Sequence, residues 1–581
     1  MKLACIFALG AAAMLAAPTF ALAQSNDSGI APARVAPRAA APSFLANVDV
    51  TLYRDIFAAQ DKKQFRNADD LIDKLTDKSL VGYVLQQRYL GPGYSSTYTE
   101  LAAWLSKYGD HFEADRVRAL AMHKKPKKAK APAGVVQARW RGQRYDLEIN
   151  VDLPVKSPRA ETLMAQFRAF ARDDHPGNAE AALLKLTAGP NLPQADIDRL
   201  ACYVASAYLA QGHDEDAFRL SENLIARSAN NAALSRWTAG LAAYRMGQFD
   251  TAAAHFEKMI ETSGASARNI AGGAFWAARA RIRAGQPERV VALLTNASYQ
   301  PDTFYGMLSA RLLGNTPGHT LTEPTLEPES FAALMQTPAA RRAVAFWQLG
   351  DNEAAERELG RAFGDISPEL DPAFAALARA LELPTLELRA AETAAHRSVY
   401  LTSLYPMPAY VPEDGFRIDR AVLFAIARQE SRFDVDARSR AGARGLMQLM
   451  PQTAAGIAKD RTLANKNGSK LDDPVFNLTL GQRYLSGLLE RQNGNLVEMV
   501  AAYNAGPNNL SRWIEAQADK SDPLLFIESI PTAETRDYIK RLMVNLWMYR
   551  LNMGEPMDGL DDFAAGKWPQ YRSISATTAE N

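Results

Sequence analysis

The chain has 581 residues, which is too long for a single hydrophobic core and predicts two to four domains. Lys and Arg (66) nearly balance Asp and Glu (65), which argues against a general nucleic-acid binder, so no nucleic-acid partner is expected. The hydrophobic fraction of 47% is ordinary for globular protein.

The first 23 residues have the pattern of a secretory signal. Lys2 precedes an apolar run at residues 3–15, and residues 21–23 read Ala-Leu-Ala, so cleavage is expected after Ala23. The alternative, a transmembrane anchor, needs about 20 apolar residues, and Pro18 counts against it. We therefore expect an exported protein without an integral membrane segment.

A flexible leader and a long helical region are expected after the signal. Residues 24–44 are rich in Ala, Pro, Ser and Arg and lack periodicity, which predicts the leader. Helical patterns dominate residues 45–400. Two segments depart from them. The basic segment 123–130 is either a solvated linker or a contact for an anionic polymer, and residues 135–153 alternate at the strand period, which predicts a small β-hairpin.

Within the helical region one sub-pattern recurs at Gly212, Gly247, Gly285 and Gly350. Each glycine ends one apolar-periodic segment, and an apolar residue five positions later belongs to the next. The first three glycines are about 35 to 38 residues apart, close to the period of helix-turn-helix repeats. Such helix pairs stack into an α-superhelical solenoid, which serves either as a partner-binding adaptor or as a scaffold that shapes access to a second domain.

Prolines at residues 401–412 stop the helical pattern and predict a domain boundary. The last domain is expected to span residues 413–555, followed by a C-terminal tail at 556–581 that is polar and loose from Gly566 onward.

Glu430 is the residue with the clearest chemical implication. A helix is expected from about Arg417, with its apolar positions on one face, and Glu430 projects from that face, whereas Arg420 and Arg428 lie on the other, solvated one. A carboxyl group at the edge of an apolar core favours its neutral form, as a general acid requires. The alternative is a buried Glu paired with an Arg.

No second catalytic group is evident near Glu430. Asp434 and Asp436 fall in a turn-like stretch, and neither is clearly placed as a nucleophile, although ordinary glycosidases use two carboxylates. A site with one carboxylate must recruit water or a substrate hydroxyl. The last domain has no His and no Cys, which excludes a Ser-His or Cys-His pair there. We expect no metal and no cofactor.

Four sequence blocks in the last domain resemble the motifs of soluble lytic murein transglycosylases. They are Glu430-Ser431-Arg432-Phe433 with the Gly442 to Pro451 loop, Asp473-Pro474 with Asn477 and Tyr484, residues 501–507 (Ala-Ala-Tyr-Asn-Ala-Gly-Pro), and Glu528-Ser529-Ile530-Pro531 with Glu534 and Tyr538. The upstream helix pairs resemble the family's large periplasmic form. The resemblance implies a mainly all-α protein, an N-terminal superhelix followed by a lysozyme-like α+β catalytic domain.

The resemblance also implies an activity. The family cleaves the β-1,4 bond between N-acetylmuramic acid and N-acetylglucosamine in peptidoglycan. Glu430 matches the acid that protonates the leaving oxygen and then accepts a proton from the muramic acid 6-hydroxyl, giving a 1,6-anhydro end. The expected location is the periplasm, free or peripheral to the outer membrane. Glycan strands are the expected partner, with cell-wall enzymes as further partners of the solenoid.

Five further positions match substrate-contacting residues of the family: Ser439, Gln448, Met450, Tyr503 and Glu534. Tyr503 would orient Glu430 or steady developing charge, and the alternative for it is a core tyrosine. The alternative for Glu534 is an ion pair with Arg536 or Arg541.

Two other functions fit the same sequence. A goose-type lysozyme would hydrolyse the same bond with water. A non-catalytic scaffold would grip peptidoglycan and recruit partners through its solenoid.

Overall fold

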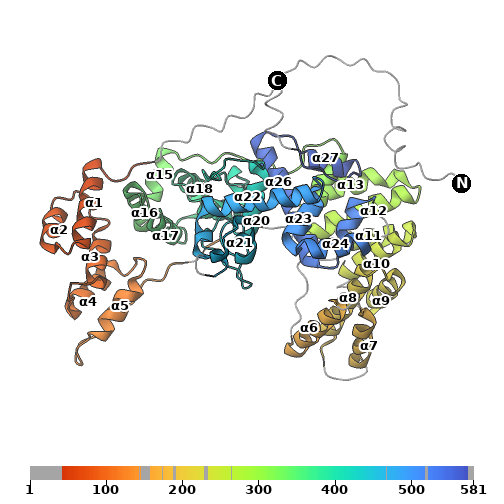
Figure 1. Cartoon of the computed structure of the whole chain (residues 1–581), viewed down its shortest axis with the longest axis horizontal. Coiled ribbons are helices and arrows are strands. Elements are labelled where there is room, and N and C mark those ends of the chain that lie inside the picture. Colours follow the sequence, from red (N-terminus) through yellow and green to blue (C-terminus); the bar gives the residue numbers. More distant parts are fainter. Residues whose placement is uncertain are drawn as a thin grey trace, which may run out of the picture. The chain divides into compact units, whose positions relative to one another are not determined.

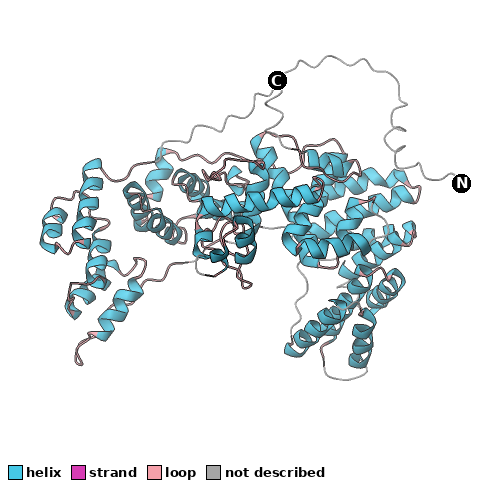
Figure 2. Cartoon of the chain, in the orientation of Figure 1, coloured by secondary structure: helices cyan, strands magenta, loops and turns pink. Residues whose placement is uncertain are grey.

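The computed structural model describes residues 42–139, 141–142, 144–145, 157–172, 175–187, 192–227, 233–262, 265–465, 468–516 and 521–572. Within these ranges the secondary structure is helical, and extended chain pairs only through isolated bridges (Figure 2), which confirms the mainly helical fold class. No helix in these ranges is long and apolar enough to span a membrane. The predicted signal and most of the predicted leader lie outside the described residues.

The N-terminal helices, which lie together in Figure 1, contribute to two small hydrophobic cores. They are α1 (Asn47–Asp61), α2 (Phe65–Ile72), α3 (Val81–Leu90), α4 (Tyr98–Tyr108) and α5 (Ala114–His123). One core includes Tyr53 and Ile56 and continues into Ala345 and Phe346, which lie almost 300 residues later in the sequence. The N-terminal helices are therefore completed by a distant part of the chain.

Most of the remaining superhelical region consists of paired helices. They are α6 (Pro158–Arg172), α7 (Pro176–Thr187), α8 (Gln194–Ala210), α9 (Asp214–Arg227), α10 (Ala233–Arg245), α11 (Phe249–Ile260), α12 (Ala267–Arg283), α13 (Val290–Ser298), α14 (Phe304–Leu312), α15 (Pro328–Leu334), α16 (Pro338–Leu349), α17 (Asn352–Ala362), α18 (Asp371–Ala380) and α19 (Pro384–Ala395). Short 3-10 helices lie at Pro287–Arg289, Pro368–Leu370 and Thr402–Leu404.

The predicted helix-pair turns are confirmed at all four glycines. Gly212, Gly247, Gly285 and Gly350 follow α8, α10, α12 and α16, and each has a φ between 75° and 89°. Glycine takes this left-handed conformation without the steric cost that a Cβ brings, so it ends a helix sharply. Each turn lets the next helix pack back on its predecessor.

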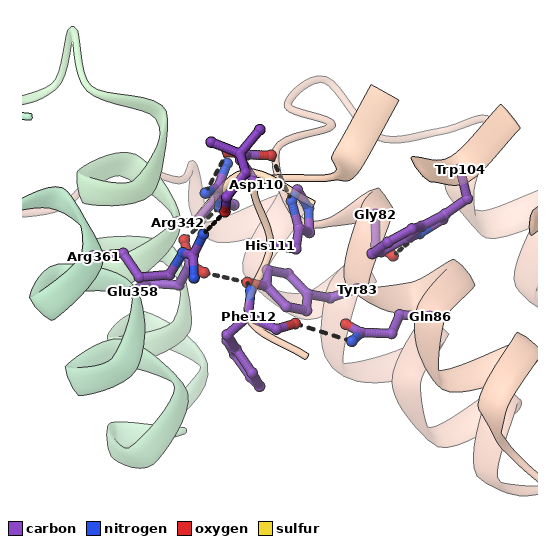
Figure 3. Close-up of polar contacts among 11 residues, drawn as sticks. Gly82, Tyr83, Gln86, Trp104, Asp110, His111, Phe112, Arg342, Glu358 and Arg361 are labelled. Carbon is purple, nitrogen blue, oxygen red and sulfur yellow. Dashed lines mark hydrogen bonds and ion pairs between the residues drawn. The ribbon is translucent and has the colours of Figure 1, made fainter. Parts of the chain in front are cut away.

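A buried polar cluster joins α3 and the α4–α5 loop to α16 and α17 (Figure 3). Glu358 of α17 is fully buried and accepts hydrogen bonds from Tyr83 and from Arg342 of α16. Arg342 also contacts Asp110 at 2.8 Å, and Asp110 contacts His111 Nδ1 at 3.1 Å. A buried carboxylate is tolerated only when it is paired and hydrogen-bonded, so this cluster fixes how the two parts meet.

The predicted β-hairpin at 135–153 is not found where the chain is described. Residues 135–139, 141, 142, 144 and 145 belong to no strand, and the rest of the segment lies outside the described residues. The Val136 carbonyl instead accepts from Arg361, and Arg141 donates to the carbonyl of Phe363 at 3.0 Å and to Asp371 at 2.5 Å. The described part of this segment therefore packs on α17 and α18 through polar contacts, while most of the alternating residues lie outside the described residues.

The C-terminal region contains α20 (Arg420–Glu430), α21 (Pro451–Ala458), α22 (Pro474–Arg491), α23 (Leu496–Ala505), α24 (Pro507–Ala516), α25 (Pro523–Ser529), α26 (Ala533–Met553) and α27 (Asp558–Ala564), with 3-10 helices at Arg461–Ala464 and Gly468–Asp472. One hydrophobic core runs from Met164 to Phe563 and includes Leu401, Leu404 and Tyr405 of the predicted boundary. The helical region and the C-terminal region thus share a core.

The tail is packed as far as Arg572, so the prediction that it is loose from Gly566 was wrong for this part. The backbone amide of Tyr571 donates to the Gly494 carbonyl at 2.8 Å, and the Pro569 carbonyl accepts from Leu496 at 2.9 Å. The Trp568 ring also packs against Phe526 with centroids 5.1 Å apart, so aromatic side chains in an otherwise polar segment hold the tail.

Candidate active site

Glu430 is the last residue of α20, a helix that is buried on almost all sides. The helix begins at Arg420, three residues after the predicted start, and every residue from Ala421 to Ala427 is buried. The prediction that Arg428 lies on a solvated face was wrong. Its guanidinium donates to the Leu404 carbonyl at 2.8 Å and to Asn545 at 2.7 Å. Glu430 therefore emerges from a buried helix that is held rigidly up to its last turn.

The environment of Glu430 raises its pKa to about 7, chiefly because burial disfavours the charged form. Tyr538 of α26 donates a hydrogen bond to Glu430 Oε1 at 2.5 Å and, with the positive charge of Arg541, opposes that rise. The negative charge of Glu534 adds to it. At neutral pH both protonation states of this carboxyl group are thus accessible.

Tyr538 is the residue that sequence reasoning missed as a partner of Glu430. Burial and the neighbouring Glu430 hold the pKa of Tyr538 well above its ordinary value, so its hydroxyl keeps its proton and acts as a donor. Tyr538 is 108 residues from Glu430 in sequence, and helix α20 packs against α26 (Figure 1). Its place in the fourth sequence block was the only available signal.

Tyr503 of α23 lies close enough to Glu430 to interact with its charge, but its hydroxyl has another acceptor. It donates to the Met447 carbonyl at 2.6 Å, and its ring packs against Tyr484 with centroids 5.6 Å apart. In this structure Tyr503 therefore holds the loop after Glu430, while Tyr538 makes the direct hydrogen bond.

The loop at 437–450 is braced by hydrogen bonds between side chains and backbone groups. Gln448 has a left-handed backbone (φ 46°), and its side-chain amide donates to the carbonyls of Ala437 at 3.0 Å and Gly445 at 2.9 Å. Ser439 is exposed, and its hydroxyl accepts from the Ala443 amide at 3.0 Å. Met450 is 37% exposed. The predicted residues Ser439 and Met450 are accessible, and Gln448 shapes the loop.

The side chain of Asn477 in α22 also holds this loop in place. Its side chain accepts from the Met447 amide at 2.8 Å and donates to the carbonyls of Arg444 and Leu471. Gly445 has a φ of 73°, and a Cβ there would lie 2.1 Å from the Leu471 carbonyl oxygen. Only glycine fits this close approach, which explains why the first and second sequence blocks meet here.

The other predicted carboxylates differ in placement. Glu534 lies exposed in the first turn of α26, one turn before Tyr538, and its charge reaches Glu430. Asp434 and Asp436 are exposed and form a turn, with the Asp436 amide donating to Asp434 at 2.9 Å. Among the described residues no group of three or more His, Cys, Asp or Glu is arranged to hold a metal ion.

A cavity of about 280 Å³ lies at the other end of α23, away from Tyr503. Asn495, Glu498, Phe526, Trp568 and Gln570 line part of it. Neither Glu430 nor any predicted site residue takes part in its lining, so the cavity is separate from the candidate site.

Known proteins resemble the C-terminal region in sequence. Residues 409–526 match the family model described as Transglycosylase SLT domain. The soluble lytic murein transglycosylase of Escherichia coli is 37% identical over 142 residues, which are 24% of this chain and 22% of that protein. The sequence match thus spans about a fifth of that relative's own length.

Solved structures extend the similarity to nearly the whole chain. An inactive mutant of the lytic transglycosylase Slt from Pseudomonas aeruginosa is 20% identical, with a TM-score of 0.56, and the match covers 91% of this chain and 89% of that one. The complex of the 70-kDa soluble lytic transglycosylase with bulgecin A is 18% identical, with a TM-score of 0.63, and the match covers 90% and 99%. The chain therefore carries a transglycosylase SLT domain behind a helical superhelix, as its resemblance to soluble lytic murein transglycosylases predicts.

Proposed function

We propose that this protein is a lytic transglycosylase that cleaves the β-1,4 bond between N-acetylmuramic acid and N-acetylglucosamine in peptidoglycan. The observation that carries the proposal is Glu430, a carboxyl group whose pKa is raised to about 7 within the matched SLT domain. A carboxyl group titrating near neutral pH can serve as an acid in one step and as a base in the next.

In the proposed mechanism protonated Glu430 donates its proton to the glycosidic oxygen as the bond to C1 of the muramic acid breaks. The resulting carboxylate is stabilised by the hydrogen bond from Tyr538. It then removes the proton of the 6-hydroxyl, whose oxygen attacks C1 and closes the 1,6-anhydro ring. The nucleophile belongs to the substrate, so its attack is intramolecular and needs no second protein carboxylate.

Three of the other predicted residues would contact the glycan. Ser439 and Met450 are exposed within the braced loop, and Glu534 is exposed on the same helix as Tyr538. Tyr503 would act indirectly, because its hydroxyl holds the Met447 carbonyl and thereby the position of the loop. Gln448 would act in the same way through its two backbone acceptors.

The product end group tests the proposed function. Purified protein is incubated with peptidoglycan sacculi, and the released fragments are analysed by mass spectrometry. We expect 1,6-anhydromuramic ends, which are one water lighter than reducing ends. Reducing ends would instead identify a goose-type lysozyme, and no released fragments from wild-type protein would favour the non-catalytic scaffold.

Replacing Tyr538 by Phe is expected to change both rate and pH profile. The variant loses the hydrogen bond that stabilises the Glu430 carboxylate, so kcat should fall about 10- to 100-fold, since such bonds to charged groups contribute about 1.5–3 kcal/mol. The pKa of Glu430 should rise, and the alkaline limb of kcat/KM, expected near pH 7 in the wild type, should move upward by about one to two units.

Tyr503→Phe is the matched control for this prediction. It removes the bond to Met447 but no direct bond to Glu430, so the alkaline limb should stay near its wild-type position. An unmoved limb in Tyr538→Phe would contradict the assigned role of Tyr538.

The organisation and location follow from the same proposal. We infer a signal at 1–23, a leader at 24–44, a superhelix at 45–400, a boundary at 401–412, a catalytic domain at 413–555 and a tail at 556–581. The exported protein would act in the periplasm, where peptidoglycan lies, and the superhelix would be the surface for cell-wall enzyme partners. N-terminal sequencing of mature protein from a periplasmic extract, expected to begin at Gln24, checks the first of these boundaries.

A further inference from the structure

The turn that follows Glu430 has an unusual backbone. Arg432 and Phe433 are consecutive non-glycine residues with φ of 57° and 67°. A left-handed conformation is strained for a non-glycine residue, so it persists only where surrounding contacts impose it. The contacts that impose it here also set the direction in which α20 ends and therefore the position of Glu430.

Part of the support for this turn is local. The Ser431 hydroxyl donates to the Ala427 carbonyl at 3.1 Å and accepts from the Phe433 amide at 3.1 Å, and the Phe433 side chain is buried. These bonds close the end of the helix. They do not fix the Arg432 side chain.

The rest of the support comes from α19, outside the SLT domain. Glu392 is only 2% exposed, and both of its oxygens accept from the guanidinium of Arg432, one of them at 2.7 Å. The same carboxylate lies 4.0 Å from Arg428, in the last turn of α20. Thr385, near the start of α19, donates to the Phe433 carbonyl at 3.1 Å. One helix of the superhelical region thus contacts the chain on both sides of Glu430.

We propose that Glu392 is a positioning residue for Glu430, so that the superhelix completes the geometry of the catalytic acid in addition to any role in binding. The inference rests on the proposed function for its catalytic consequence. The planar, bidentate pair with Arg432 restricts orientation as well as distance, which a lysine or a single hydrogen bond would not do.

Removing the carboxylate of Glu392 has a defined electrostatic consequence. Glu430 interacts with Tyr538, Arg541 and Glu534 of α26 and with Tyr503 of α23. Without Glu392, the turn that directly follows Glu430 is loosened and admits water to the carboxyl group. Better hydration favours the Glu430 carboxylate and lowers its pKa.

The test replaces Glu392 by Gln in the full chain and measures activity on sacculi. We expect kcat about tenfold lower with little change in KM, because small displacements of a reacting group cost rate. The alkaline limb should move to lower pH, opposite to the shift expected for Tyr538→Phe. Arg432→Lys keeps the charge without the planar fork, so it should lower kcat while leaving the limb nearer its wild-type position.

Asp371→Asn supplies the matched control. Asp371 is fully buried in α18 and paired with Arg141 and Arg397, so its replacement should lower the Tm as Glu392→Gln does. Neither of these ion pairs includes a residue of the 431–436 turn. The Asp371→Asn variant should therefore keep the wild-type kcat and the wild-type alkaline limb. If the Glu392→Gln protein has a lower Tm but the wild-type kcat and pH profile, Glu392 has only a structural role and the proposal is overturned.

A second readout separates this inference from the proposed function. Carbon-13 NMR of glutamate-labelled protein, assigned by its difference from Glu430→Gln, reports the titration of Glu430 without substrate. We expect a pKa of about 7 in the wild type, a lower pKa in Glu392→Gln and no change in Asp371→Asn. Wild-type protein that forms no anhydro ends would refute the proposed function, while an unshifted Glu430 pKa in Glu392→Gln would refute the positioning role.

Discussion

Replacing Glu430 by Gln is expected to lower the rate of peptidoglycan cleavage by about a thousandfold or more. The amide cannot donate a proton to the leaving oxygen, and it cannot accept one from the 6-hydroxyl, so both proton transfers are lost. The measurement is the rate of anhydromuropeptide release from sacculi, compared with wild-type protein at the same concentration and pH.

Stability measurements show whether this loss reflects chemistry or unfolding. The folded-state pKa of Glu430 is raised to about 7, so its contribution to stability is greatest at low pH and is lost as the pH rises through 7. Glu430→Gln does not ionise, and its Tm at pH 8 should therefore equal or exceed that of the wild type. A variant that keeps more than a tenth of the wild-type rate would refute the assignment of the acid.

Replacing Lys540 by Met is expected to destabilise the protein by about 3–5 kcal/mol, because it leaves a buried carboxylate without its counter-ion. Lys540 of α26 and Glu528 of α25 are each 1% exposed in their side chains and contact at 3.0 Å. Tyr305 of α14 donates to the same Glu528 oxygen at 2.6 Å. Chemical denaturation measures the effect, with loss of helical circular dichroism as the signal.

The double variant Lys540→Met, Glu528→Gln is the control, because it removes both charges together. It should recover most of the lost stability, since the penalty arises from the unpaired charge. Equal stability of the single variant and the wild type would contradict the buried-pair interpretation.

The pH dependence gives a further check on this pair. Burial would raise the pKa of Glu528, but Lys540, the hydrogen bond from Tyr305, and the charges of Arg536 and Arg268 together outweigh burial and hold it below its ordinary value. A depressed pKa contributes stability above the unfolded-state value, and that contribution is lost as the pH falls through the folded-state value. Wild-type protein should therefore lose stability steeply below about pH 4.3, and the double variant less so.

Local sequence patterns predicted the helix pairs and the helix that carries Glu430. Gly212, Gly247, Gly285 and Gly350 could be recognised because a left-handed turn favours one residue type at one position. The apolar run before Glu430 predicted a buried helix, but a one-sided pattern underestimated its burial. Leu423, Phe424 and Ala427 are also buried, although they lie outside the apolar face that the periodicity predicts.

The contacts that complete the candidate site could not be predicted in this way. Tyr538 lies 108 residues from Glu430, and Glu392 lies 40 residues from Arg432 in a different region of the fold. A single ion pair or hydrogen bond leaves no periodic trace in sequence, because any exposed surface also contains Glu, Arg and Tyr. Motif resemblance identified the block that contains Tyr538, and only the structure showed which tyrosine donates to Glu430.

The buried cluster around Glu358 also imposes an order on how the protein can be assembled. Tyr83 and Glu358 are 275 residues apart, and the core around Tyr53 needs Ala345 and Phe346. At roughly 5–20 residues per second, translation delivers these partners on the order of tens of seconds after the first helices. During that interval the apolar side chains of the nascent N-terminal helices are not yet covered by α16 and α17. We therefore expect holdase chaperones to bind this segment until α16 and α17 are synthesised.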